Sequence, residues 1–165
     1  PALEGPPTFA AMVRRLRVHG AREQYVHEDR SQNHRMSELE AAWLRLQLPS
    51  LADANGRRAD IARRYRAAAP GARWHEDHPH HVVHQCVLRA ADRDALRTAL
   101  AGRGVATGVH YPLAVHQQPA FLQFARHACP EAEAWARECV SLPCFPELTD
   151  DEVDRVAEAL AVTEP

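Results

Sequence analysis

Apolar residues in the first part of the chain recur at spacings of three and four, the pattern of amphipathic helices. The first run predicts a helix that starts at Thr8 and stops at His19-Gly20, because glycine readily ends a helix. The second run begins where Ser37 is followed three positions later by Glu40, a capping box that marks a helix N-terminus. This second helix is predicted to reach about position 48.

Pro49 interrupts the pattern, but apolar residues resume at helical spacing and continue to Tyr65. Proline removes a backbone donor and bends or ends a helix, so we expect two consecutive helices or one kinked helix. The helical pattern ends before Pro70-Gly71. The stretch 1–70 is therefore predicted to be a helical segment.

Helices and strands alternate in the next part of the chain. Residues 82–89 are rich in β-branched side chains and predict a strand. Asp92 is a suitable cap for the helix that follows, and Gly102 and Gly104 close it. Residues 105–111 then predict a second strand.

The last part of the chain contains two further predicted helices. One begins near Pro130, and its apolar positions extend to Val140 at helical spacing. Residues 142–146 are too short and too rich in proline for a central strand, so we expect an edge strand or an extended loop. Thr149 to Glu152 form a second capping box before the final helix. The stretch 71–165 is predicted to be a small α+β domain.

Composition narrows the class of protein. The chain has 165 residues, of which 45% are hydrophobic and 25% charged, as in globular proteins. Its 20 basic residues, all arginine, are offset by 22 acidic residues, so nothing favours a nucleic acid as partner. No apolar stretch approaches the roughly 20 residues that span a bilayer. We expect a cytoplasmic protein without membrane contact.

Histidine is the most unusual feature of the composition, with five residues crowded into ten positions. Such a cluster either binds a metal or forms a solvated loop, and its irregular spacing and Pro79 favour the loop. No metal site is therefore predicted. The five residues are His75, His78, His80, His81 and His84.

The four cysteines are irregularly spaced and contain no CxxC pair, which argues against a zinc or redox motif. Buried free thiols are the expectation. The residues are Cys86, Cys129, Cys139 and Cys144.

Two segments carry candidate binding residues. His110 and Tyr111 end a predicted strand, and His116 follows in the next loop, where scaffolds commonly present side chains to a ligand. Asn33 and Arg35 precede the helix that begins after Ser37, where free backbone amides and the helix dipole favour a phosphate. Taken alone, the residues of both segments favour a simpler explanation, namely ordinary packing for the first and a turn that leads into a helix for the second.

Together, four ordered motifs resemble the C-terminal part of the DegT/DnrJ/EryC1/StrS family, fold-type I aminotransferases that act on nucleotide-linked keto-sugars. Before Asn33 the family has glycine and an aromatic or hydrophobic residue, whereas this chain has Ser31-Gln32. If the backbone needs a positive φ there, serine would alter the loop. The matching stretches are 14–20 (RRLRVHG), 33–42 (NHRMSELEAA), 110–119 (HYPLAVHQQP) and 142–149 (LPCFPELT).

The resemblance implies a function for each candidate residue. Asn33 is similar to the asparagine that reaches the phosphate of pyridoxal 5'-phosphate in the neighbouring subunit of a homodimer. His110, Tyr111 and His116 resemble the wall of the substrate pocket. The implied fold is a small, mostly antiparallel sheet packed with helices, and the stretch 1–70 would link it to a large domain. The implied reaction transfers an amino group, from a donor such as glutamate, to the nucleotide-linked keto-sugar.

The chain contains no lysine, although the family forms its Schiff base through a lysine of the large domain. No catalytic residue is therefore assigned, and we expect this sequence to be an incomplete catalytic unit that is inactive alone. Two alternatives stay open. The chain could be a non-catalytic dimerisation or binding module derived from this family, or part of a related pyridoxal-phosphate-dependent sugar dehydratase.

Overall fold

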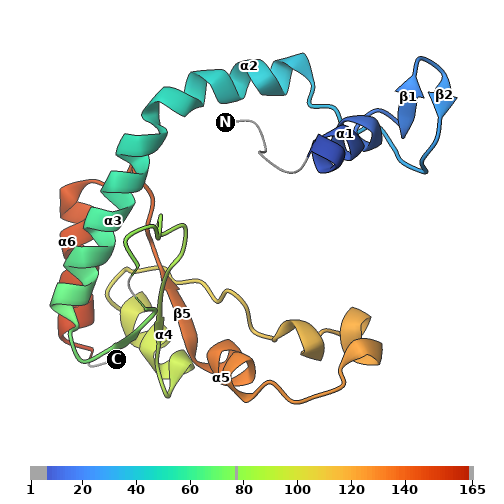
Figure 1. Ribbon diagram of the computed structural model, residues 1–165. Helices are drawn as coiled ribbons and strands as arrows, with labels where there is room; N and C mark the ends of the chain where they lie inside the picture. Colours follow the sequence, from blue (N-terminus) through green and yellow to red (C-terminus); the bar gives the residue numbers. More distant parts are fainter. Residues whose placement is uncertain (1–6, 77, 164–165) are drawn as a thin grey trace. The chain divides into compact units, whose positions relative to one another are not determined.

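The computed structural model describes residues 7–76 and 78–163, which form two compact units divided between Pro49 and Ser50 (Figure 1). Each unit has its own secondary structure. The N-terminal unit contains helix α1 (Pro7–Leu16), strands β1 (Ala21–Glu23) and β2 (Val26–His27), and helix α2 (Glu38–Gln47).

The chain leaves α1 through a turn that requires glycine. His19 and Gly20 have φ values of 61° and 70°, which ends the helix where the sequence predicted. A Cβ on Gly20 would lie 1.9 Å from the carbonyl oxygen of Asp29, so no other residue fits without movement. The antiparallel β1–β2 hairpin that follows was not predicted, because its sequence is mostly polar and lacks a period.

Helix α2 begins at its predicted capping box. The Ser37 hydroxyl accepts a hydrogen bond from the Glu40 amide, and the Glu40 carboxylate accepts one from the Ser37 amide. No side chain of α2 is buried within this chain. Its exposed large apolar side chains are those of Leu39, Trp43, Leu44 and Leu46.

The C-terminal unit alternates helices and strands, as predicted for an α+β fold. A 3-10 turn separates α2 from the next helix, so the two consecutive helices expected around Pro49 are confirmed. That turn, η1 (Leu48–Ser50), spans the division between the units, and the elements after it are α3 (Leu51–Ala68), β3 (Arg73–Trp74), β4 (Cys86–Arg89), α4 (Arg93–Ala101), η2 (Val115–Gln117), η3 (Pro119–Phe124), α5 (Pro130–Glu138), β5 (Cys139–Leu142) and α6 (Asp150–Ala161).

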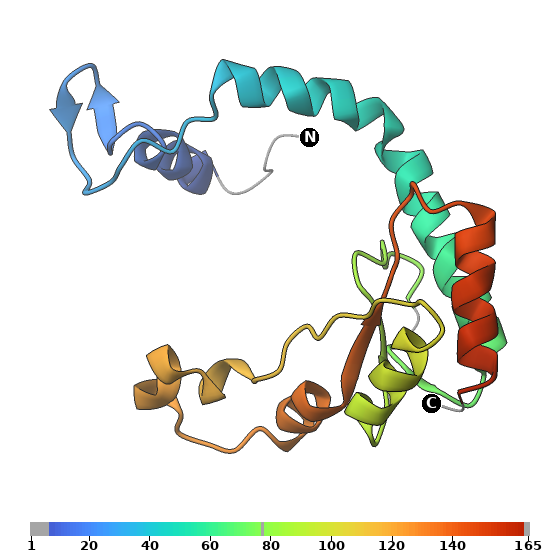
Figure 2. The same cartoon turned by 180° about the vertical axis from the view of Figure 1, so that it is seen from behind.

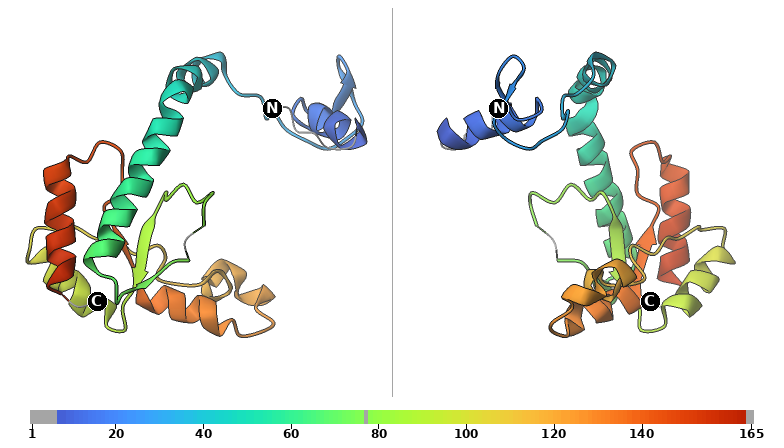
Figure 3. Two further views of the ribbon diagram at one scale, coloured as in Figure 1. Left: turned by 60° about the vertical axis from the view of Figure 1, so that its left-hand side comes forward. Right: turned by 90° about the vertical axis from the view of Figure 1, so that its right-hand side faces the viewer.

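The core of this unit lies between a small antiparallel sheet and three helices. The sheet has the order β3-β4-β5, and α6 lies alongside α3 (Figures 2 and 3). Leu88 pairs with Val140 across the central strand. Both side chains are fully buried and pack in one cluster with residues of α3, α4 and α6, including Ile61 and Leu160.

Two expectations about secondary structure were wrong. Residues 105–111 form no strand, and only Gly108 makes an isolated bridge to Ser141 on the edge of β5 that β4 does not occupy. The helix that starts at Pro130 ends at Glu138, and the following apolar residues form β5 instead. The regular strand therefore precedes the stretch 142–146.

One ion pair is largely buried at the end of the central strand β4. The Arg89 side chain is only 10% exposed, and its Nε donates to a Glu138 carboxylate oxygen at 2.8 Å. Arg73 binds the same oxygen through Nη1 at 3.1 Å. The Arg89 guanidinium also lies 5.3 Å from the ring centre of Trp135. The hydrogen bond from Arg89 is the main cause that lowers the pKa of Glu138 from its ordinary value of 4.5.

This ion pair predicts a pH dependence of stability. Because the folded pKa of Glu138 is lowered, the pair stabilises the fold above pH 4.5 and loses its effect as pH falls through the folded pKa. Glu138→Gln is expected to flatten the acid side of the stability profile, measured as the urea midpoint between about pH 7 and 3. Glu131→Gln is the matched control, since that side chain is 91% exposed and lies 3.6 Å from Arg89. An unchanged acid slope in Glu138→Gln would contradict the prediction.

Candidate functional site

Asn33 is held firmly in the N-terminal unit. Its backbone forms an isolated antiparallel bridge with Val18, and the neighbouring His34 amide donates to the Arg17 carbonyl at 3.0 Å. The Asn33 Oδ1 accepts hydrogen bonds from the amide of Arg35 at 3.2 Å and from its Nε at 3.0 Å. These bonds fix the amide plane. The exposed Asn33 Nδ2 has no partner among residues 7–76 and 78–163 and remains available to a ligand.

The departure from the family pattern at Ser31 does not strain this loop. Ser31 is absent from the described non-glycine residues with positive φ, which are His19, Tyr25 and Val83. Its hydroxyl donates to the carbonyl of Leu16 at 2.5 Å. The serine therefore ties the loop to the end of α1.

The N-terminus of α2 offers less to an anion than its sequence suggested. The capping box occupies the Glu40 amide and brings the Glu40 carboxylate to the first turn, so an anion would meet a negative charge there. Hydrogen bonds to Ser37 lower the pKa of Glu40 and keep this carboxylate ionised. A phosphate would therefore bind the Asn33 amide and the Arg35 guanidinium. An amide donor beside a guanidinium fits a phosphate group.

His110 is positioned by β5. Its Nδ1 lies 2.9 Å from the Oγ of Ser141 and shares a hydrogen bond with it. The imidazole packs against Gly108, where a Cβ would lie only 2.7 Å from the ring Cε1. A side chain at position 108 would therefore have to displace the imidazole of His110. The aromatic ring of Tyr111 meets the His110 ring edge to face at 5.4 Å between centres.

Tyr111 and His116 line one cavity of about 570 Å³ in the C-terminal unit. His110 does not line it. Most of the lining is apolar, and Tyr111 and His116 supply a hydroxyl and an imidazole. The other lining residues are Leu113, Ala114, Val115, Phe121, Phe124, Cys129, Ala132 and Ala136.

Glu133, a residue of α5, contacts His116, and no motif in the sequence had marked Glu133 as a site residue. Its Oε1 lies 3.0 Å from the Nε2 of His116 and accepts a second hydrogen bond from the Cys129 amide at 3.1 Å. The bonds from His116 and from Cys129, in that order, lower the pKa of Glu133. The histidine therefore faces an ionised carboxylate near neutral pH.

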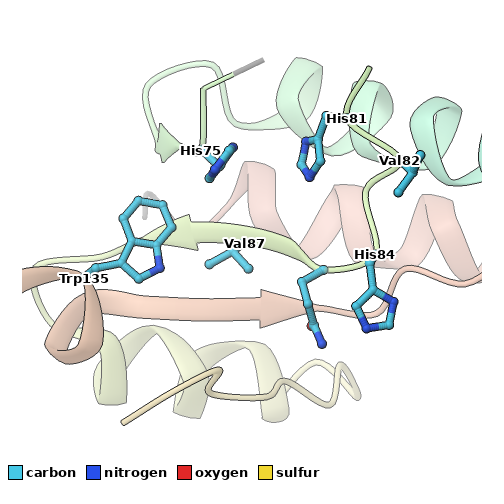
Figure 4. Close-up of a pocket in the computed structure, with 7 residues that line it drawn as sticks. His75, His81, Val82, His84, Val87 and Trp135 are labelled. Atoms are coloured by element: carbon cyan, nitrogen blue, oxygen red, sulfur yellow. The ribbon is translucent and has the colours of Figure 1, made fainter. Parts of the chain in front are cut away.

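The histidine cluster contributes to a second cavity, of about 540 Å³ (Figure 4). His75 and His81 lie on one side of β4 with their ring centres 5.1 Å apart, whereas His84 points away from them. Among the residues that the structure describes, no group of three or more His, Cys, Asp or Glu side chains could hold a metal ion.

The cysteines are free, and three of the four are buried as expected. Cys129 is exposed, contrary to the expectation, because it precedes α5 in a surface loop. A hydrogen bond to Cys144, together with burial, raises the pKa of Cys86. This thiol is therefore protonated and unreactive at neutral pH.

Solved structures with the same fold show which class of protein has this architecture. S. venezuelae DesV, solved in complex with a ketimine intermediate, matches with a TM-score of 0.87 and 37% identity over 95% of this chain and 44% of DesV. A DegT/DnrJ/EryC1/StrS aminotransferase from Brucella abortus matches with a TM-score of 0.85 and 25% identity over 94% of this chain and 43% of that one. The fold is that of the C-terminal part of sugar aminotransferases.

The sequence identifies the family. The model of the DegT/DnrJ/EryC1/StrS aminotransferase family matches residues 6–161, and the chain belongs to this family. Its members are pyridoxal-phosphate-dependent enzymes, and the structure of Bacillus subtilis NtdA, whose fold matches with a TM-score of 0.85, contains the cofactor PMP. Among the residues that the structure describes, no helix has both the length and the apolar character to cross a membrane.

Two curated relatives are similar to almost the whole of this chain. The erythromycin biosynthesis sensory transduction protein EryC1 of Saccharopolyspora erythraea is 40% identical over 93% of this chain and 44% of its own length. The dTDP-3-amino-3,4,6-trideoxy-α-D-glucose transaminase of Streptomyces venezuelae is 38% identical over 94% of this chain and 43% of its own. The chain thus spans less than half the length of these relatives.

Proposed function

We propose that this chain is the C-terminal portion of a pyridoxal-phosphate-dependent aminotransferase that aminates a nucleotide-linked keto-sugar, with glutamate as amino donor. The main support is the similarity to DesV, which extends over 95% of the chain at a TM-score of 0.87. Because the chain has no lysine, the Schiff-base residue would come from the part of the enzyme that precedes this portion in its relatives.

In this proposal the cofactor phosphate binds at Asn33. Pyridoxal phosphate, when bound, supplies the carbonyl group that takes up an amino group from the donor and passes it to the sugar. The Asn33 Nδ2 donates a hydrogen bond to a phosphate oxygen, while the Arg35 guanidinium holds Oδ1 and adds positive charge. The family resemblance assigns this contact to the neighbouring subunit, so the complete enzyme would be a homodimer.

The C-terminal unit would provide a pocket for the sugar substrate. Tyr111 and His116 line a cavity whose apolar surface suits the ring face of a deoxygenated sugar, and both side chains can bind a hydroxyl group. His110 contributes by holding the adjacent segment to Ser141. The site would thus orient the sugar without performing a covalent step itself.

A chimeric enzyme tests this function. Residues 6–161 replace the matching C-terminal part of the S. venezuelae transaminase, which retains its own N-terminal part. The chimera is expected to bind pyridoxal phosphate, seen by its visible absorbance, and to convert dTDP-3-amino-3,4,6-trideoxy-α-D-glucose and 2-oxoglutarate to the corresponding dTDP-linked 3-keto sugar and glutamate. The N-terminal part alone is the control. A chimera that folds and dimerises but binds no cofactor would overturn the proposal and favour a dimerisation module.

A further inference from the structure

The imidazole of His116 is held by a single carboxylate across the C-terminal unit. His116 lies in η2 and Glu133 in α5, and their Nε2 and Oε1 atoms are 3.0 Å apart. Both side chains are largely shielded from solvent, at 21% and 26% exposure. Partial shielding makes the orientation of such a pair more definite than that of an exposed ion pair.

A second hydrogen bond, independent of His116, holds the Glu133 carboxylate in place. Its Oε1 accepts the Cys129 amide at 3.1 Å, so the side chain folds back over the first turn of α5. That turn carries the positive end of the helix dipole, which favours a carboxylate there. The histidine therefore contacts an acceptor whose position is set by the helix.

The other ring nitrogen of His116, Nδ1, is available to bind a ligand. Nδ1 has no hydrogen-bond partner among the described residues, and His116 lines the cavity that Tyr111 shares. A neutral imidazole carries its proton on one nitrogen, and a carboxylate acceptor at Nε2 selects that nitrogen. In that neutral form Nδ1 is unprotonated and can accept a hydrogen bond.

We infer that Glu133 is a positioning residue, which fixes His116 as the Nε2-protonated form and so presents Nδ1 as the acceptor for a ligand hydroxyl group in this cavity. The identity of that hydroxyl, as one on the sugar, rests on the proposed aminotransferase function. The Glu133–His116 hydrogen bond is observed in the structure and does not depend on the proposed function.

Nitrogen NMR of the histidine rings in the full chain tests the pair. His116 is assigned by its loss in His116→Gln, and spectra are recorded near pH 8.5, about two units above the ordinary imidazole pKa. The wild-type ring is expected to give one protonated nitrogen, Nε2, and one unprotonated nitrogen, Nδ1. Glu133→Ala is expected to yield a mixture of the two tautomers.

Two further variants separate positioning from general structure. Glu133→Gln should keep the wild-type pattern, because its amide oxygen can still accept from Nε2. Glu131→Ala, which removes a 91% exposed carboxylate from the same helix, should also keep it. The same tautomer mixture in wild type and Glu133→Ala, with the remaining spectrum unchanged, would overturn the inference.

Activity of the chimera then tests the ligand hydroxyl separately. His116→Ala and Glu133→Ala are each expected to lower kcat/KM by about tenfold, and the double variant by no more than His116→Ala alone, since one hydrogen bond is lost. Additive losses would show that the two residues act independently. An inactive chimera whose NMR pattern is as expected would refute the aminotransferase function and leave the pair intact.

Discussion

Replacing Leu88 by alanine is expected to lower the free energy of unfolding of the C-terminal unit by about 2–5 kcal/mol. Leu88 is fully buried in the central strand and belongs to the cluster that joins the sheet to α3, α4 and α6. The variant loses the transfer free energy of the side chain and leaves a cavity that a strand paired on both edges cannot close.

Urea unfolding followed by tryptophan fluorescence measures this loss, because Trp74 and Trp135 both belong to this unit. Val87→Ala is the matched control. Val87 is the adjacent residue of β4, points to the opposite face and is only half-buried, so its truncation should cost no more than about 1 kcal/mol. Equal losses in the two variants would contradict the assignment of the core to the Leu88 face.

The second large effect concerns Asn33. In the chimera, Asn33→Ala is expected to weaken pyridoxal-phosphate binding by about 1–3 kcal/mol, roughly 5- to 150-fold, because a charge-assisted hydrogen bond to the phosphate is lost. Fluorescence or absorbance titration of the cofactor measures the change. Gln32→Ala is the control, since this adjacent side chain is also exposed. Unchanged affinity in Asn33→Ala would remove this residue from the site.

Mixed dimers test whether Asn33 serves the partner's site. One protomer carries Asn33→Ala, and the other lacks the Schiff-base lysine of its N-terminal part. If Asn33 acts on the neighbouring subunit, the mixed dimer contains one intact site and recovers about half the activity. If it acts within its own subunit, both sites are damaged and activity is not recovered.

Helices were largely predictable because their signals are local. Each capping box needs only four consecutive residues, and both Ser37 and Thr149 cap their helices as the sequence indicated. The stop at Gly20 likewise follows from its own conformation and from the approach of Asp29. The capping interactions lie within four residues and the contact of Gly20 with Asp29 within nine, so these signals are local in the sequence.

Strand positions were less predictable, because they depend on partners distant in sequence. The apolar spacing through Cys139 and Val140 fits either a helix face or a buried strand, and pairing with β4 decides for the strand. Residues 105–111 have strand-like side chains, but only Gly108 reaches a free edge of β5. Helical spacing therefore gave the wrong element at Cys139 and Val140, and strand propensity gave the wrong element at residues 105–111.

The residues of the candidate site likewise fall into two groups, those that are close in sequence and those that are brought together only by folding. Asn33 and Arg35 interact within one turn, and Tyr111 and His116 are close in sequence, so sequence reasoning could single them out. Glu133 lies 17 residues from His116, and Ser141 lies 31 residues from His110. No motif links those positions in one sequence, because only the packing of α5 and β5 brings them together.

The pairing of α3 with the end of the chain has a consequence during protein synthesis. Arg57 donates to the carbonyl of Leu148, which is made 91 residues later, and Tyr65 donates to Pro143, which is made 78 residues later. At translation rates of about 5–20 residues per second, Tyr65 is synthesised roughly 4 to 16 seconds before the first of these partners, Pro143. The apolar face of α3, with Ile61 and Tyr65, is then available to chaperones or to other nascent chains until β5 and α6 cover it.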